Sequence, residues 1–157
     1  MEYLQLVEAL IQYLIMINLK DLMFPLLILD KKRGIAQLWV DFTNLKSLQK
    51  SIILKNELVG SKLFSFDGGY FEIMVLEDKG RLTPFWKYGL FNPLHKVEIF
   101  VNKVESNFDK SKNDILEVVS SDDSFWNEYP FHKSLINEIK NSKNLTQIIN
   151  AFIAIEG

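Results

Sequence analysis

The residues that could do chemistry are few in this chain of 157 amino acids. It has no cysteine, two histidines (His95 and His132) and two arginines. Hydrolytic, redox and metal sites draw mostly on Cys, His and clustered carboxylates, and neither histidine lies at metal-ligand spacing from another ligand. The glycine-rich run Asp67-Gly68-Gly69 lacks the lysine and the helix start of a phosphate loop. We therefore expect that the protein is not an enzyme and that it has no catalytic residue, no metal and no cofactor.

Carboxylates offer the remaining route to catalysis. Asp67 could pair with Glu72 or Glu98, but such a pair works only when the two groups are held close together with well-separated pKa values. A second acidic cluster, around residues 122–128, lacks the alternating oxygen ligands and the glycine of a calcium loop, so helix capping is the favoured interpretation. An enzyme that uses scattered carboxylates stays an alternative.

Aromatic residues are abundant by contrast, with twelve Phe, five Tyr and three Trp. Two stretches are densest, Pro84–Phe91 and Phe125–Phe131. Consecutive side chains of an extended strand point to opposite faces, so one member of each adjacent aromatic pair needs cover from a helix, a ligand or a partner. Exposed Trp and Tyr often dominate protein interfaces. Each stretch therefore belongs either to the core or to an interface.

The charge is nearly balanced, at −2 overall, but it is unevenly distributed along the chain. Residues 31–63 hold seven basic and two acidic residues, and residues 105–128 hold seven acidic and two basic ones. These segments either neutralise each other within the domain or leave an acidic surface that attracts a basic partner. The balance argues against nucleic acid or a membrane as the partner. The candidate partner-binding residues are Trp86, Tyr88, Asp122, Asp123, Trp126, Glu128 and Tyr129.

The N-terminal stretch Tyr3–Leu19 is strongly apolar, interrupted by Gln5, Glu8 and Gln12. Those three polar residues recur at spacings of three and four, which places them along one stripe of a helix. The stretch is shorter than the roughly 20 residues of a membrane span, and it lacks the positive start of a secretion signal. We expect a helix with a wide buried face in a cytoplasmic protein.

The middle of the chain predicts strands. Leu26–Leu29 and Ile35–Phe42 flank a polar turn, which is typical of a hairpin. Gly-containing turns then separate four further strands, which predicts a meander; they span residues 63–66, 70–77, 81–88 and 96–104. Between the hairpin and the meander, a lysine-rich segment from Thr43 or Asn44 to Lys55 has the apolar spacing of a helix.

The last third is mostly helical in its pattern. We expect a polar loop over Asn107–Asn113. The pattern of Asp114–Val119 fits either a short strand or a helix, and the strand is favoured. A helix is predicted from Pro130 to about Asn141, and a final helix over Leu145–Ile155. The residues of the first helix that are expected to face inward are Phe131, Leu135, Ile136 and Ile139. The chain is thus predicted to be one α+β domain over residues 1–157. It has a mostly antiparallel sheet of about five or six strands, with an N-terminal helix and C-terminal helices packed on it.

The functional hypothesis follows from this profile, because no motif identifies a reaction. We expect a small intracellular protein that binds and inhibits a protein partner, of the kind that bacteria use as immunity proteins or antitoxins. A basic toxin domain is one such partner, since an acidic surface could cover its active surface. The alternatives are a small-molecule-binding domain with an aromatic-lined pocket of about 300–1,000 Å³ and the carboxylate enzyme. The pattern predicts no oligomeric state.

Overall fold

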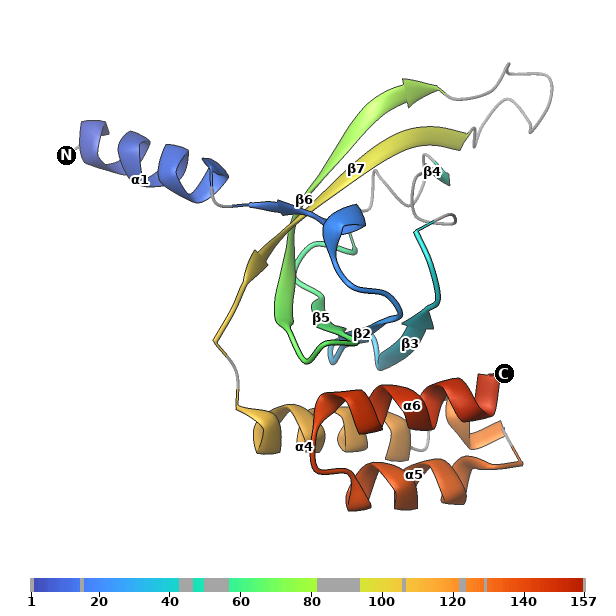
Figure 1. The fold of residues 1–157 in the computed structure, drawn as a ribbon. Helices are drawn as coiled ribbons and strands as arrows, with labels where there is room; N and C mark the ends of the chain where they lie inside the picture. Colours follow the sequence, from blue (N-terminus) through green and yellow to red (C-terminus); the bar gives the residue numbers. More distant parts are fainter. Residues whose placement is uncertain are drawn as a thin grey trace.

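The protein forms an antiparallel sheet of seven strands with helices on one of its faces (Figure 1). The computed structural model describes residues 2–14, 16–42, 47–49, 57–81, 94–105, 107–121, 124–128 and 130–156. The strands are β1 (Ile17–Asn18), β2 (Leu26–Asp30), β3 (Ile35–Trp39), β4 (Ser47–Gln49), β5 (Lys62–Ser65), β6 (Tyr70–Arg81) and β7 (Leu94–Lys103). They lie in the order β1-β7-β6-β5-β2-β3, and β4 also pairs with β7. The predicted α+β class, hairpin and meander are confirmed.

The meander differs from its prediction where β6 continues through residues 78–80. The expected turn is absent there, and β6 reaches Arg81 while paired with β7, with register shifts near Ile73/Val75 and Asp78/Arg81. Such irregularities bend a strand and increase its twist. Gly80 has a φ of 102°, a backbone conformation open mainly to glycine. This glycine therefore lies at the strand irregularity and does not form a turn that reverses the chain. Most of the strand expected over 81–88 lies outside the described residues.

Two hydrophobic clusters occupy the two faces of the sheet. The apolar run of β2 explains why there are two, because successive side chains of a strand alternate between faces. Leu26 and Ile28 pack with Leu63 of β5 on one face. Leu27 and Leu29 lie on the other face, against the helices. A strand buried on both sides is therefore the central element of the fold.

The C-terminal part of the chain forms three helices and a short 3₁₀ helix, which are α4 (Phe108–Ser120), η3 (Phe125–Glu128), α5 (His132–Asn141) and α6 (Leu145–Glu156). Helices α4 and α6 and the 3₁₀ helix cover this second face of the sheet, and α5 packs against α4 and α6 on the side away from the sheet (Figure 1). The two predicted helices of this region are confirmed.

Two predictions are wrong in this region, because both segments belong to α4 or cap it. They are the loop over Asn107–Asn113 and the strand over Asp114–Val119. Asn107 caps this helix by accepting a hydrogen bond from the amide of Lys110 (3.1 Å). Ile115, Val118 and Val119 are buried, at the spacing of three and four residues that a helix needs.

The N-terminal segment is also different from its prediction. Helix α1 (Glu2–Leu14) is followed by β1, which pairs with β7, and by the 3₁₀ helix η1 (Leu19–Asp21). Instead of packing on the sheet, α1 projects away from it (Figure 1). Its side chains Tyr3, Leu4, Leu6 and Leu10 are 55–78% exposed, so the predicted burial of this helix is wrong. No helix in the described ranges is long and apolar enough to cross a membrane.

The prediction of a lysine-rich helix up to Lys55 is wrong for the residues of that segment that the structure describes. Ser47–Gln49 forms β4 and pairs with Leu94–Lys96 of β7. The rest of that prediction concerns residues outside the described ranges.

Candidate functional site

Trp126 was the one predicted interface aromatic that the structure describes, and it belongs to the core. Its side chain is 3% exposed, and its ring meets Phe152 edge to face with centroids 5.2 Å apart. Its indole Nε1 donates a hydrogen bond to the carbonyl of Ala36 (2.9 Å). A buried ring with a satisfied N–H cannot serve as an exposed anchor, so that role for Trp126 is wrong.

Of the other predicted partner-binding residues, the structure describes only Glu128. Glu128 is exposed at the end of η3, as an interface residue would be. Trp86, Tyr88, Asp122, Asp123 and Tyr129 lie outside the described residues.

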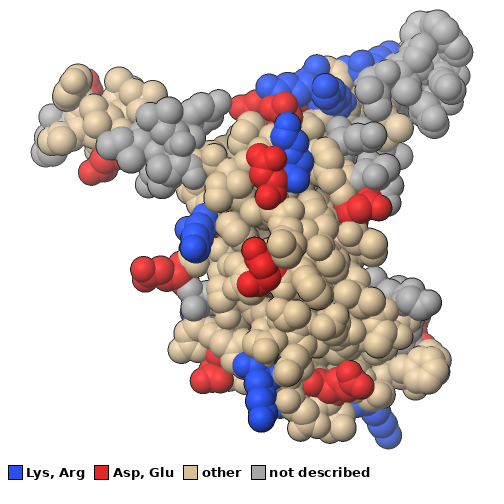
Figure 2. Space-filling view, viewed as in Figure 1, with Lys and Arg blue, Asp and Glu red and all other residues tan. Residues whose placement is uncertain are grey.

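Among the described residues, Lys31 forms the ion pairs that join the basic segment to the acidic one. Nζ of Lys31 lies 3.0 Å from Asp114 and 3.1 Å from Glu117. Hydrogen bonds to Asp114 and then to Glu117 raise the pKa of Lys31 above its ordinary value of 10.5. On the face shown in Figure 2, acidic and basic side chains are scattered among a larger area of uncharged residues. At these residues the two segments neutralise each other, which leaves less of the acidic segment to attract a partner.

The carboxylates proposed for catalysis each have a different partner. Asp67 accepts a hydrogen bond from the hydroxyl of Ser65. Glu72 pairs with Lys62 at 3.4 Å, and Glu98 lies 3.5 Å from Lys79. In the described part of the chain no contact joins two of these three carboxylates, so the structure does not bring them together as an acid–base pair.

Both histidines hold structural hydrogen bonds. Nδ1 of His95 on β7 lies 2.8 Å from a carboxylate oxygen of Asp78 on β6, and Nε2 of His132 donates to the carbonyl of Val119 (2.8 Å). Across the residues that the structure describes, no three His, Asp or Glu side chains gather closely enough to hold a metal ion.

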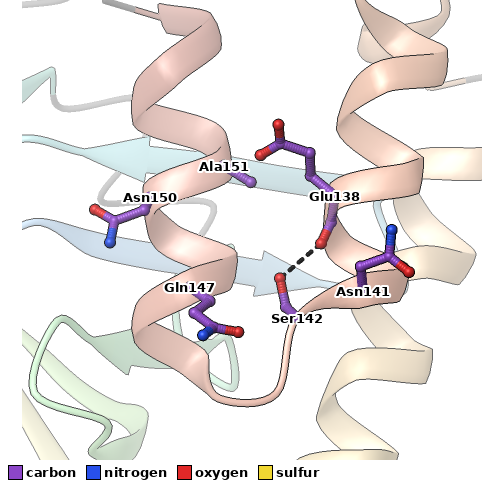
Figure 3. A pocket seen from close by; sticks show the side chains of 6 residues that line it. All are labelled: Glu138, Asn141, Ser142, Gln147, Asn150 and Ala151. Carbon is purple, nitrogen blue, oxygen red and sulfur yellow. Dashed lines mark hydrogen bonds between the residues drawn. The ribbon is translucent and has the colours of Figure 1, made fainter.

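A groove between α5 and α6 is the best candidate for a binding site (Figure 3). One part is a depression of about 340 Å³ where the two helices meet. Five of its six lining residues have polar side chains; the six are Glu138, Asn141, Ser142, Gln147, Asn150 and Ala151.

A second depression of about 190 Å³ continues the first, because the two share Glu138 and Ala151. Its other lining residues are mostly apolar and comprise Phe131, Ser134, Leu135, Ala154 and Ile155. We call the two depressions together the α5–α6 groove. One end of this groove is apolar, the other carries carboxamides, and a carboxylate lies between them.

Phe131 is the exposed aromatic side chain of this groove. It is 61% exposed, although the sequence pattern predicted it to face inward. The helical spacing does not apply to it, because α5 begins at His132 and Phe131 occupies the capping position. Only Leu135 and Ile139 of that pattern are fully buried. The sequence signal that could have identified it is Pro130, which places Phe131 at the boundary of the helix.

Helical geometry explains why Glu138 is the only charged residue among the described residues that line the groove. Glu138 lies one turn from Ser134 and Leu135, on the same side of α5. Lys133 and Lys140 fall on a different side of the helix at 3.6 residues per turn, and neither lines the groove. The carboxylate of Glu138 makes no hydrogen bond or ion pair with the described residues, so it is available to a ligand.

Capping interactions at the α5–α6 turn hold the polar end in place. Asn144 accepts a hydrogen bond from the amide of Gln147 (2.9 Å), and the side-chain oxygen of Gln147 accepts one from the amide of Lys143 (2.7 Å). The hydroxyl of Ser142 donates to the carbonyl of Glu138 (2.7 Å; Figure 3). While the oxygen of Gln147 accepts from Lys143, its amide nitrogen can donate to a ligand.

Two other described cavities are less suited to binding. A charged cleft of about 400 Å³ surrounds Arg33, whose guanidinium is held by Asp30 (2.6 Å) and Glu57 (3.2 Å). Another cavity, lined in part by Phe64, Tyr70 and Phe71, has a volume of only about 100 Å³. That is smaller than the roughly 300–1,000 Å³ of a small-molecule site.

Comparisons with known protein families, curated proteins and solved structures find no match to this chain. The chemistry of the α5–α6 groove is therefore the basis on which a function can be argued.

Proposed function

We propose that this protein binds and inhibits a protein partner inside the cell, in the manner of an immunity protein or antitoxin. We place the contact at the α5–α6 groove. The observation that carries the proposal is the order of groups along that groove: the exposed ring of Phe131, the carboxylate of Glu138, and then the side chains of Asn141, Gln147 and Asn150.

This order fits a partner segment with a cationic side chain beside an apolar one. An arginine could form two parallel hydrogen bonds with the carboxylate of Glu138, and its planar group could stack on the ring of Phe131. Carboxamides both donate and accept hydrogen bonds, so the polar end suits the exposed backbone of a peptide segment.

A protein segment suits the groove better than a small molecule does. Small-molecule sites bury most of their ligand inside a concave pocket, whereas this groove runs along the surface between two helices and its Asn and Gln side chains are exposed. A partner that covers the groove also covers neighbouring surface, and residues such as Glu128 then contribute at the edge of the contact.

The inhibitory role rests on charge. Of the described residues that line the groove, the one charged residue is acidic, and the chain as a whole carries −2. A basic active surface, such as that of a toxin acting on a polyanion, would be attracted to this site and masked by it.

Affinity purification from the native cell would identify the partner, and binding would then be measured with the two purified proteins. Because charged hydrogen bonds contribute about 1.5–3 kcal/mol, we expect Glu138→Gln to weaken binding about 10- to 100-fold. Ser134→Lys, inside the groove, should weaken it similarly. Asn137→Lys is the matched control, since it adds the same charge to an exposed position of α5 that does not line the groove.

Inhibition would be measured as the partner's activity, and as cell survival if the partner is toxic. Wild type and Asn137→Lys should inhibit, and Glu138→Gln should require a higher concentration. Equal binding by all four proteins would contradict the placement at the groove. A partner that binds without losing activity would contradict the inhibitory role.

A further inference from the structure

The apolar stripe of α1 consists of Tyr3, Leu6, Val7 and Leu10, which recur at the spacing of one helix face. We infer that this stripe pairs with the same stripe on a second copy of the chain, with the two α1 helices antiparallel. The inference goes beyond the proposed function and uses a different surface, so either can fail alone.

The first observation is that the stripe is uncovered. Tyr3, Leu6 and Leu10 are 78%, 62% and 55% exposed. No extensive contact joins α1 to another helix or strand among the residues that the structure describes. Several large apolar side chains exposed together on one helix mark a surface that another molecule covers.

The second observation concerns charge, and it selects the occupant. The only ionisable side chains on α1 besides Tyr are Glu2 and Glu8, and the helix has no lysine or arginine; the described part of α1 accordingly shows no blue atoms in Figure 2. Helices that bind membrane surfaces are typically rich in cations on their polar face. The stripe itself carries no positive and no negative side chain. Two copies of it can therefore pair without bringing like charges together.

The third observation is the direction of α1, which projects from the sheet (Figure 1). Another copy can therefore approach the stripe without contacting the body of the domain. In an antiparallel pair the two bodies lie at opposite ends of the helix pair. A parallel pair would place both bodies at the same end and Glu2 beside Glu2, so the antiparallel arrangement is favoured.

The length of α1 sets the strength of the pair. A helix of 13 residues is about 20 Å long at 1.5 Å per residue. A strip of that length and about 10 Å wide covers a footprint of roughly 200 Å² on each copy, well below the 800 Å² per partner of a standard interface. We therefore expect a weak, reversible dimer that forms only at high protein concentration.

Sedimentation equilibrium of the full chain from about 1 to 300 µM would test the inference. The average mass should rise with concentration from 18.3 kDa towards twice that value. Leu6→Glu should weaken the association at least tenfold. Gln5→Glu is the matched control, because it adds the same charge to the neighbouring residue on the polar side of α1, and it should associate like wild type. Circular dichroism would confirm that each variant remains folded.

Three results would overturn the inference. A wild-type protein that stays monomeric at 300 µM would exclude the pair. Equal association of Leu6→Glu and wild type would place a dimer interface elsewhere. Binding of the monomer to vesicles of neutral phosphatidylcholine, lost in Leu6→Glu, would assign the stripe to a lipid surface instead.

Discussion

Helices α1 and α6 have similar lengths and similar aliphatic content but opposite environments. They contain 13 and 12 residues, and aliphatic side chains make up more than half of each. Ile148, Ile149 and Phe152 of α6 are completely buried. Three apolar residues of α1 at comparable helical spacing, Tyr3, Leu6 and Leu10, are more than half exposed.

The difference lies in the contacts that each helix finds along the chain. Helix α6 packs on α5, β3 and β5, and its first turn is attached to the turn after β5 by a hydrogen bond from the hydroxyl of Thr146 to the carbonyl of Phe66 (2.7 Å). Helix α1 is followed at once by β1, which pairs with β7 at Val101 and Phe100, and α1 is directed away from the sheet. An amphipathic pattern thus defines a face, while the neighbouring elements decide what that face contacts.

The largest effect should come from Phe152→Ala in α6. Removing a fully buried ring that contacts Trp126 should lower the free energy of unfolding by about 3–5 kcal/mol. Leu10→Ala in α1, by comparison, should change it by less than about 0.5 kcal/mol. Urea denaturation at a protein concentration where the chain is monomeric would measure both. Similar losses in the two variants would mean that α1 is packed on the body in solution.

A smaller loss should follow from Trp126→Phe, which keeps a ring against α6. The substitution removes the hydrogen bond to the carbonyl of Ala36, and an unsatisfied buried carbonyl costs about 1–3 kcal/mol. Phe131→Ala, on the exposed aromatic of the groove, should change stability by less than about 0.5 kcal/mol. Thermal melts of both variants would rank the two aromatics. A larger loss for Phe131 than for Trp126 would reverse their assignment as surface and core residues.

Sequence patterns predicted the elements whose partners are local. The hairpin of β2 and β3, the meander of β5, β6 and β7, and helices α5 and α6 all follow from apolar spacing and turn residues, because their contacts lie close in the chain. The burial of Trp126 depends on Ala36, which is 90 residues away. Local spacing carries no information about such a contact, so core and interface both stayed open for that tryptophan.

The site was less predictable than the fold for the same reason. The α5–α6 groove forms because two separate helices bring Glu138 beside Asn150 and Ala151, and no spacing within one helix shows that. Helix α4 was missed because its N-terminal half is rich in Lys, Asn and Asp, which resembles a loop until Asn107 is recognised as its cap. Acidic residues at 114 and 117 appeared available to a partner, although Lys31, far earlier in the chain, neutralises them.

The smallest effect should come from Lys31→Gln, which tests whether charge helps to attach the helical layer that contains α4 and α6. Lys31 lies just after β2 and contacts two carboxylates of α4, which raise its pKa above 10.5 in the folded protein. A raised folded-state pKa adds stability that is fully present below the unfolded-state pKa and is lost as the pH rises through the folded-state value. Wild type should therefore be slightly more stable than Lys31→Gln at pH 8, and this difference in the free energy of unfolding should disappear above pH 10.5.

Because all three side chains are at least partly exposed, salt should also reduce the gap in stability between the two proteins. Paired urea titrations at pH 8 and pH 11, with and without about 1 M salt, would measure it. A gap that persists at pH 11 would show that the aliphatic stem of Lys31 stabilises the layer by packing, as the side chains of α6 do.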